Sequence, residues 1–191
     1  MKSNILIKEL IELTHKNKAE LLPLRNMTDQ ALNFKPDPES WSILECVEHL
    51  NRYGRYYIPE ITNRIEQSTH SKADDFKSSW LGEYFAKSML PKEKLNKMKT
   101  FKSMNPINSA LDRAVLDELI GQQDQLETLL EQAREKNLTK IKTSISISNW
   151  IKLRLGDTFR VVIYHNWRHV VQIKNVLKSI PHGTNVYPGT L

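Results

Sequence analysis

The chain has little cysteine and no long hydrophobic run, and each shortage excludes a class of protein. Cys46 is the single cysteine, which excludes an intramolecular disulfide and any metal site built from several cysteines. No apolar run reaches the roughly 18 residues that suggest a membrane-spanning helix. Lys2 and Lys8 place charge where a signal peptide would be apolar, so we expect a cytoplasmic protein without a membrane partner. A bound metal would have to rest on His, Asp or Glu.

The length and composition suit one globular domain. The chain has 191 residues, of which 39% are hydrophobic, and this is enough for one substantial core. Nothing in the sequence calls for a second core. We therefore expect a single domain over residues 1–191.

Positive charge is in excess, with a formal net charge of +6. Clustered lysines are a usual means of neutralising nucleic-acid phosphates. The segment 87–102 is rich in loop signals and has few arginines or aromatic residues placed to read bases. We therefore interpret it as a solvated connection and do not expect a nucleic-acid partner. Its lysines are Lys87, Lys92, Lys94, Lys97, Lys99 and Lys102.

Four stretches have apolar residues at helical spacing, which predicts an all-α protein. The first helix covers about 4–22. Ser40 or Ser42 can cap the second, because a hydroxyl can accept a hydrogen bond from the exposed amides of the first turn. Pro59 is expected to kink this second helix. Residues 143–148 alternate between polar and apolar, which fits a short strand or an extended loop.

One long interruption precedes the third helix. Residues 70–105 are too many for an ordinary helix connection, and we expect short helical pieces at about 80–89 and near Pro91. This excursion could wall a pocket. The third helix is expected over 106–136, since proline is favoured in a first turn. A Gly-Asp pair supplies the start of the fourth helix, expected over 156–179.

Three histidines carry most of the functional information. His165 and His169 lie four residues apart on the fourth helix, so their imidazoles project from one face about one turn apart. At about 100° per residue, both fall on the arc that also holds Val162 and Ile173, where the core should be. His49 lies at the margin of the apolar face of the second helix. Three histidine ligands would leave the open coordination positions that a catalytic metal requires.

A structural role competes with the metal role. One histidine at a core margin is more often a satisfied structural residue than a ligand. Three core-directed histidines favour a metal, because burying several imidazoles needs partners that an apolar core does not supply. We therefore predict that His49, His165 and His169 bind a metal. The remaining histidines lie in polar or loop-like sequence and are interpreted as surface residues: His15, His70 and His182.

Two neighbours of His49 also carry reactive groups. Glu45, one turn earlier, could accept a hydrogen bond from an imidazole, act as a general base beside bound water, or be a helix-surface carboxylate, in that order of preference. Cys46 is about 60° from His49 toward the apolar face. A buried inert thiol is the favoured interpretation there, ahead of a nucleophile.

Two motifs carry a family resemblance. Residues 41–50 read Trp-Ser-x-x-Glu-x-x-x-His-Leu, and residues 157–172 read Asp-Thr-Phe-Arg-Val-Val-Ile-Tyr-His-Asn-Trp-Arg-His-Val-Val-Gln. In their order and spacing these motifs resemble the DinB-like superfamily, also called the DinB/YfiT family of metalloenzymes. The resemblance covers nearly the whole chain, including residues 101–106 before the third helix.

The resemblance implies a fold and a ligand set. Family members are four-helix bundles in up-down-down-up order, with a long crossover between the second and third helices. A divalent metal, zinc or nickel at the level of the family, is held by three histidines, which match His49, His165 and His169. Four further residues would line the site or support the ligands: Trp41, Glu45, Tyr53 and Gln172.

The resemblance also implies a class of chemistry. Relatives include thiol S-transferases that use bacillithiol, mycothiol or glutathione, and a mycothiol-dependent maleylpyruvate isomerase. We therefore expect a metal-dependent thiol S-transferase or small-molecule hydrolase, with a small-molecule substrate and a low-molecular-weight thiol as a further cofactor. Relatives often form homodimers. The alternative is a non-catalytic, stress-associated metal-binding or interaction protein.

Overall fold

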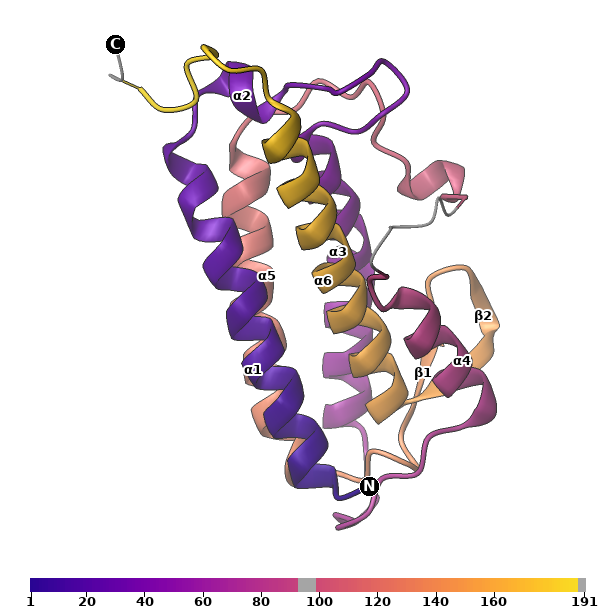
Figure 1. The fold of residues 1–191 in the computed structure, drawn as a ribbon. Helices are drawn as coiled ribbons and strands as arrows, with labels where there is room; N and C mark the ends of the chain where they lie inside the picture. Colours follow the sequence, from indigo (N-terminus) through magenta and orange to yellow (C-terminus); the bar gives the residue numbers. More distant parts are fainter. Residues whose placement is uncertain (93–98, 189–191) are drawn as a thin grey trace.

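Four long helices form a bundle (Figure 1): α1 (Ser3–Leu21), α3 (Ile43–Glu66), α5 (Ala114–Ala133) and α6 (Leu155–Ser179). The computed structural model describes residues 1–92 and 99–188. Helices α1 and α6 run in one direction and α3 and α5 in the other, which gives the order up-down-down-up. Both α1 and α3 pack against α5 and α6. The predicted all-α fold with a long crossover before the third bundle helix is confirmed.

The bundle core consists of two apolar clusters. One takes residues from the first halves of α1 and α6 and the second halves of α3 and α5, and it includes Leu10, Leu130 and Phe159. The other lies toward the opposite helix ends and includes Leu44 and Ile173. Each helix turns one apolar face to its neighbours, so tertiary burial stabilises all four.

A buried polar layer separates the two clusters. Asn17, Asn51, Gln123 and Asn166 contribute to it, one from each bundle helix. Amide nitrogens of this layer donate inside the bundle: Asn166 donates to Gln123 at 3.3 Å, and Asn51 donates to the Val115 carbonyl at 2.8 Å. The predicted metal ligands lie at the same level of α3 and α6, so the core is already polar where they enter it.

A helix and a hairpin lie beside the bundle, next to α6 (Figure 1): α4 (Trp80–Met89), β1 (Lys142–Ile145) and β2 (Ser148–Arg154). The strands are antiparallel, with a register shift between Ser144 and Ile145. Helix α4 confirms the short helix predicted over 80–89. Of the two alternatives for residues 143–148, strand or extended loop, β1 shows that 143–145 are strand. The partner strand β2 was not expected. Three short helical turns complete the fold: η1 (Leu22–Asn26), α2 (Asp29–Leu32) and η2 (Lys102–Met104).

The predicted start of the third bundle helix is wrong. Helix α5 begins at Ala114, eight residues after the expected Pro106. Asn108 has a φ of 61°, which a continuing α-helix does not allow, and its N–H donates to the Glu45 carboxylate at 2.5 Å. The Asp112 side chain accepts from Ala114 N at 2.7 Å and so supports the first turn. Tertiary contacts therefore hold residues 106–113 outside the helix.

The fourth bundle helix agrees with its predicted range to within one residue. Helix α6 begins at Leu155, and Asp157 is buried within its first turn. The Asp157 carboxylate accepts from the hydroxyls of Ser78 and Ser79 and from the Ser79 N–H. Ser79 also caps α4 by accepting from Gly82 N at 3.0 Å. Asp157 thus fastens the start of α4 to the start of α6.

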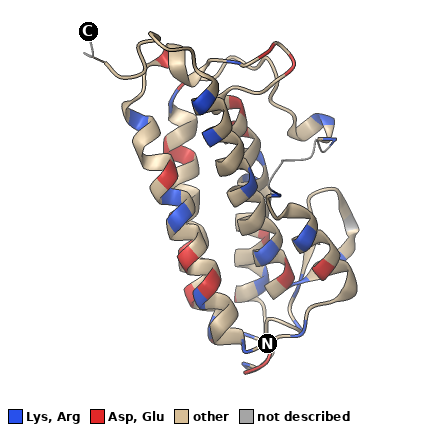
Figure 2. Ribbon diagram, viewed as in Figure 1, with Lys and Arg blue, Asp and Glu red and all other residues tan. Residues whose placement is uncertain are grey.

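The charged residues are interspersed along the long helices (Figure 2). Several form ion pairs between helices, such as Lys174 of α6 with Glu20 of α1 at 2.8 Å. Lys94 and Lys97 of the lysine-rich segment lie outside the described residues. Within the described part of the chain, every helix is too short or too polar to cross a membrane.

Candidate metal centre

The start of α3 fixes the position of His49. Ser42 is the capping residue of the two serines considered: its hydroxyl accepts from Glu45 N at 3.2 Å, and the Glu45 carboxylate accepts from Ser42 N at 2.8 Å. This reciprocal capping box satisfies two amide groups of the first turn. His49 lies two turns later, where α3 faces α6.

A loop covers the outer edge of His49. Trp41 Nε1 donates to the Asn105 side chain at 3.1 Å, and Arg52 donates to the carbonyls of Ser103 and Asn105 at 3.3 and 3.0 Å. These bonds hold residues 103–105 against α3. They bring the carbonyl of Met104 to His49, with 2.7 Å between that oxygen and His49 Nδ1.

The structure brings the three predicted histidines together. His165 Nε2 lies 3.2 Å from His49 Nε2 and 3.1 Å from His169 Nε2, and one ligand atom from each residue lies within 4.8 Å of the others. Two nitrogens that each lie about 2.0–2.1 Å from a tetrahedral ion are about 3.3 Å apart. Among the described residues, this is the one group of three or more His, Cys, Asp or Glu side chains that could hold a metal ion.

The outer ring nitrogens fix the positions of the protons. The Met104 carbonyl only accepts, so His49 Nδ1–H donates to it. His169 Nδ1–H donates in the same way to Gln172 Oε1 at 2.9 Å. Both Nε2 atoms therefore present lone pairs to His165 Nε2. One proton on that atom can satisfy only one of them, whereas a cation suits all three.

Burial favours the neutral, metal-binding form of these imidazoles. Burial, opposed in part by the hydrogen bond to Met104, lowers the pKa of His49 to about 4. Burial also lowers the pKa of His165 and His169 well below the usual value, and neighbouring imidazoles add to the effect. Neutral imidazoles can bind a metal at pH 7 without first releasing a proton.

Three of the four expected supporting residues contact the histidines. The ring centroids of Trp41 and His49 are 4.6 Å apart, and those of Tyr53 and His165 are 4.8 Å apart. Gln172 accepts the hydrogen bond from His169. Burial, with a smaller effect of Tyr57, raises the pKa of Tyr53 to about 12, so its hydroxyl is protonated at neutral pH.

Glu45 is placed differently. It is buried, yet its carboxylate accepts from Ser42 N and Asn108 N and forms an ion pair with Lys35 at 2.8 Å. These partners occupy both oxygens, so Glu45 supports the histidines by fixing the start of α3 and the loop before α5. Neither its burial nor these bonds fit a helix-surface carboxylate.

The other reactive side chains stay away from the centre. Cys46 is fully buried, and burial raises the pKa of its thiol far above the usual range, which agrees with an inert thiol. The three histidines interpreted as surface residues are exposed: His15, His70 and His182.

A cavity of about 280 Å³ opens beside His165. Helices α3, α4 and α6 and the hairpin surround it, and Tyr53 and His165 are among the residues that line it. The expectation that the 70–105 excursion walls a pocket is therefore confirmed, since Tyr84, Phe85 and Met89 line it.

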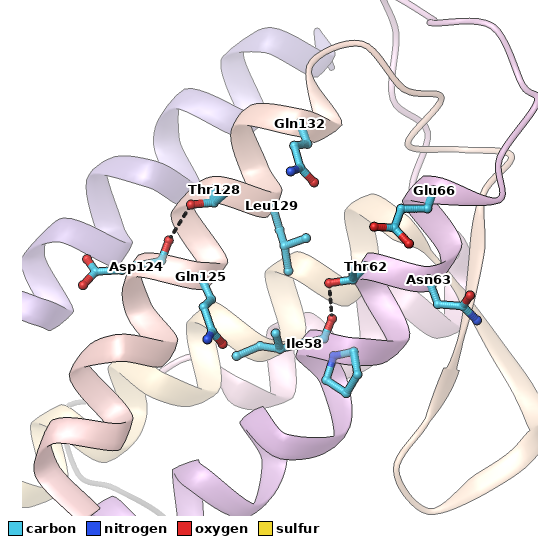
Figure 3. A pocket seen from close by; sticks show the side chains of 10 residues that line it. Ile58, Thr62, Asn63, Glu66, Asp124, Gln125, Thr128, Leu129 and Gln132 are labelled. Atoms are coloured by element: carbon cyan, nitrogen blue, oxygen red, sulfur yellow. Dashed lines mark hydrogen bonds between the residues drawn. The ribbon is translucent and has the colours of Figure 1, made fainter.

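A larger hollow, of about 710 Å³, lies on the bundle surface between α3 and α5 (Figure 3). Its two threonines are satisfied within their own helices: Thr62 donates to the Ile58 carbonyl and Thr128 to that of Asp124. None of the three clustered histidines lines it, and its acidic side chains, Glu66 and Asp124, belong to no group of three potential ligands among the described residues. The smaller cavity beside His165 is therefore the one connected with the metal centre.

Two parts of the centre were missed by sequence reasoning. The Met104 carbonyl is a backbone group, which no residue type signals. The hairpin residues that line the cavity, Ile145 and Leu153 among them, could have been found only if 142–154 had been interpreted as two paired strands.

Comparison with protein families matches residues 13–173 to the family described as the DinB superfamily. Neither the curated proteins nor the solved structures include a match to the chain. The family match covers all of α3 and α6 as far as residue 173, and so includes all three histidines of the centre.

Proposed function

The chain belongs to the DinB superfamily, and we propose on that basis that it is a divalent-metal-dependent enzyme whose ligands are His49, His165 and His169. The observation that carries the proposal is the convergence of three Nε2 atoms, two of which present lone pairs because their Nδ1 protons are engaged elsewhere. The reaction we propose is transfer of a low-molecular-weight thiol to an electrophile, or hydrolysis of a small substrate.

A divalent metal at this position would lower the pKa of a bound thiol or water, so that thiolate or hydroxide becomes available near neutral pH. The chain's own groups would orient the ligands. The Met104 carbonyl holds the His49 ring, and Gln172 holds that of His169. Such outer contacts set both ring orientation and ligand basicity.

A catalytic role is supported by the cavity beside His165. A structural zinc site is closed by a fourth protein ligand, whereas a catalytic one keeps a position open. Within the described residues, the ligand group has three members, and a space of about 280 Å³ adjoins one of them. Trp41 and Tyr53 flank the histidines and would limit the access of bulk water.

Turnover should depend on both the metal and the histidines. We expect the zinc- or nickel-loaded chain to conjugate 1-chloro-2,4-dinitrobenzene with at least one of cysteine, glutathione and bacillithiol, or to hydrolyse p-nitrophenyl acetate. Chelation should abolish the rate and added metal should restore it. The measurement is absorbance of product with time, for the parent, His169→Ala and the exposed-histidine control His70→Ala.

The control should retain the parental rate, while His169→Ala should lose at least about 90% of it, because one of three ligands is missing. A rate that survives both chelation and His169→Ala would contradict metal-dependent catalysis. Absence of turnover with every thiol and ester would favour the non-catalytic alternative.

A further inference from the structure

The cavity beside His165 has mostly apolar walls. Its described lining is aromatic and aliphatic for the most part and includes no Asp, Glu, Lys or Arg. Representative wall residues come from three elements: Tyr57 from α3, Phe85 and Met89 from α4, and Val161 from α6. A charged molecule that entered would lose its hydration without gaining a partner of opposite charge.

Two of the hydroxyl groups in these walls are engaged in hydrogen bonds within the protein. Tyr57 Oη accepts from Ser146 N at 3.3 Å, and Ser88 Oγ donates to the Phe85 carbonyl at 2.7 Å. The nearby cation Arg160 is paired with Glu83 at 2.6 Å and is mostly buried. The described walls therefore offer a charged ligand no partner of opposite charge, while Tyr53 and His165 offer polar atoms to an uncharged one.

The size of the cavity limits the ligand further. A cavity of about 150 Å³ is enough to bind benzene. The space here is about 280 Å³, which suffices for a bicyclic ring system or for one ring with a short alkyl chain. Its outer rim is also apolar, because Tyr84, Phe101 and Ile147 are 60%, 52% and 46% exposed there.

We propose that this cavity selects an uncharged, largely apolar substrate of one or two rings, with its body between α4, α6 and the hairpin and its polar reacting group at His165. This inference rests on the proposed function for the reaction at His165. The selectivity itself comes from the walls and does not need the metal.

The test is displacement of a neutral two-ring fluorescent probe, 6-propionyl-2-(dimethylamino)naphthalene, from the metal-loaded chain. Three competitors of similar size and shape are compared. They differ mainly in charge: tert-butylbenzene is neutral, phenyltrimethylammonium is a cation, and benzenesulfonate is an anion. None of the three is a good metal ligand. We expect tert-butylbenzene to displace the probe at a concentration at least about a hundredfold lower than either ion.

Two substitutions locate the probe. Val161→Phe fills part of the cavity and should weaken probe binding about tenfold or more. Gln125→Phe, in the hollow between α3 and α5, is the matched control and should leave it unchanged. If Val161→Phe does not fold, as judged by circular dichroism, Ser88→Phe from α4 fills the same space and should weaken binding similarly.

The proposal would be overturned if the ions displaced the probe at the same concentration as tert-butylbenzene, or if Gln125→Phe weakened probe binding as much as Val161→Phe. A preference for phenyltrimethylammonium would also overturn it and would indicate an aromatic cage for cations. A failure of the metal proposal can be distinguished from a failure of this one. His169→Ala and the chelated parent should still bind the probe and prefer the neutral competitor, so selective binding without turnover supports this inference while contradicting the proposed enzyme.

Discussion

Zinc or nickel should raise the thermal unfolding midpoint of the chain by about 8–16 °C when free metal exceeds its dissociation constant about a thousandfold. A ligand that binds only the folded state stabilises it by about 4 kcal/mol at that excess. For a chain of this size, each kcal/mol corresponds to about 2–4 °C. The measurement is circular dichroism at 222 nm during heating, on protein purified without a metal-affinity tag and first treated with chelator.

The shift should depend on the three histidines. His49→Ala and His169→Ala each remove one predicted ligand, and we expect most of the shift to vanish in both. The matched control is His15→Ala, which removes an exposed histidine of α1 and should respond to metal like the parent. Equal shifts in His169→Ala and the parent would show that the metal binds elsewhere.

Acid should destabilise the metal-free chain between pH 6.5 and about 4. Burial lowers the pKa of His49 from 6.5 to about 4, so in this interval the unfolded chain binds a proton that the folded chain does not. The stability due to neutral His49 is therefore fully present above pH 6.5 and is lost as pH falls toward 4. For His49 alone the loss is on the order of 3 kcal/mol. The positive charges of Arg52 and Arg168 also disfavour protonation of the nearby histidines, and so act in the same direction as burial.

Urea unfolding of the chelated chain at pH 7, 6 and 5 measures this loss. His49→Gln should flatten the dependence on pH, while His70→Gln, at an exposed loop position, should not. Burial alone would raise the pKa of Glu48 and Glu60, but hydrogen bonds and neighbouring arginines lower it below 4.5. The stability that these carboxylates contribute is therefore lost as pH falls from 4.5 through the lowered pKa, which is below the measured range of pH 7 to 5. Constant stability from pH 7 to 5 would contradict the account of three buried neutral imidazoles.

The helical spacing of apolar residues was sufficient to predict the four bundle helices, because each helix turns a single apolar face to the core. The four bundle helices follow from apolar spacing, and α1 differs from its predicted bounds by one residue at each end. The spacing of His165 and His169 places both on the inner face of α6, because helical geometry alone decides it. His49 was predicted to join them because it also lies at the edge of an apolar helix face, and the family resemblance supplied the order of the helices that brings the two faces together.

Contacts between distant segments explain what was missed. Residues 106–113 have helix-compatible sequence, but the bond from Asn108 N to Glu45 holds them in an irregular path. Asp157 suits a helix start by residue type, yet its carboxylate instead binds two serines about 80 residues earlier in the chain. The spacing of Ser42 and Glu45 is that of a capping box, but the other partners of Glu45, Lys35 and Asn108, are defined by the tertiary fold.

We expect one metal ion to lie among the three imidazoles and to keep a coordination position open toward the cavity. A crystal structure of the metal-loaded chain, with anomalous data collected on both sides of the zinc and nickel edges, tests it most directly. We predict one anomalous peak about 2.0–2.3 Å from the Nε2 atoms of His49, His165 and His169, with no fourth protein ligand. A peak elsewhere, no peak at metal saturation, or a fourth side chain closing the site would contradict the account.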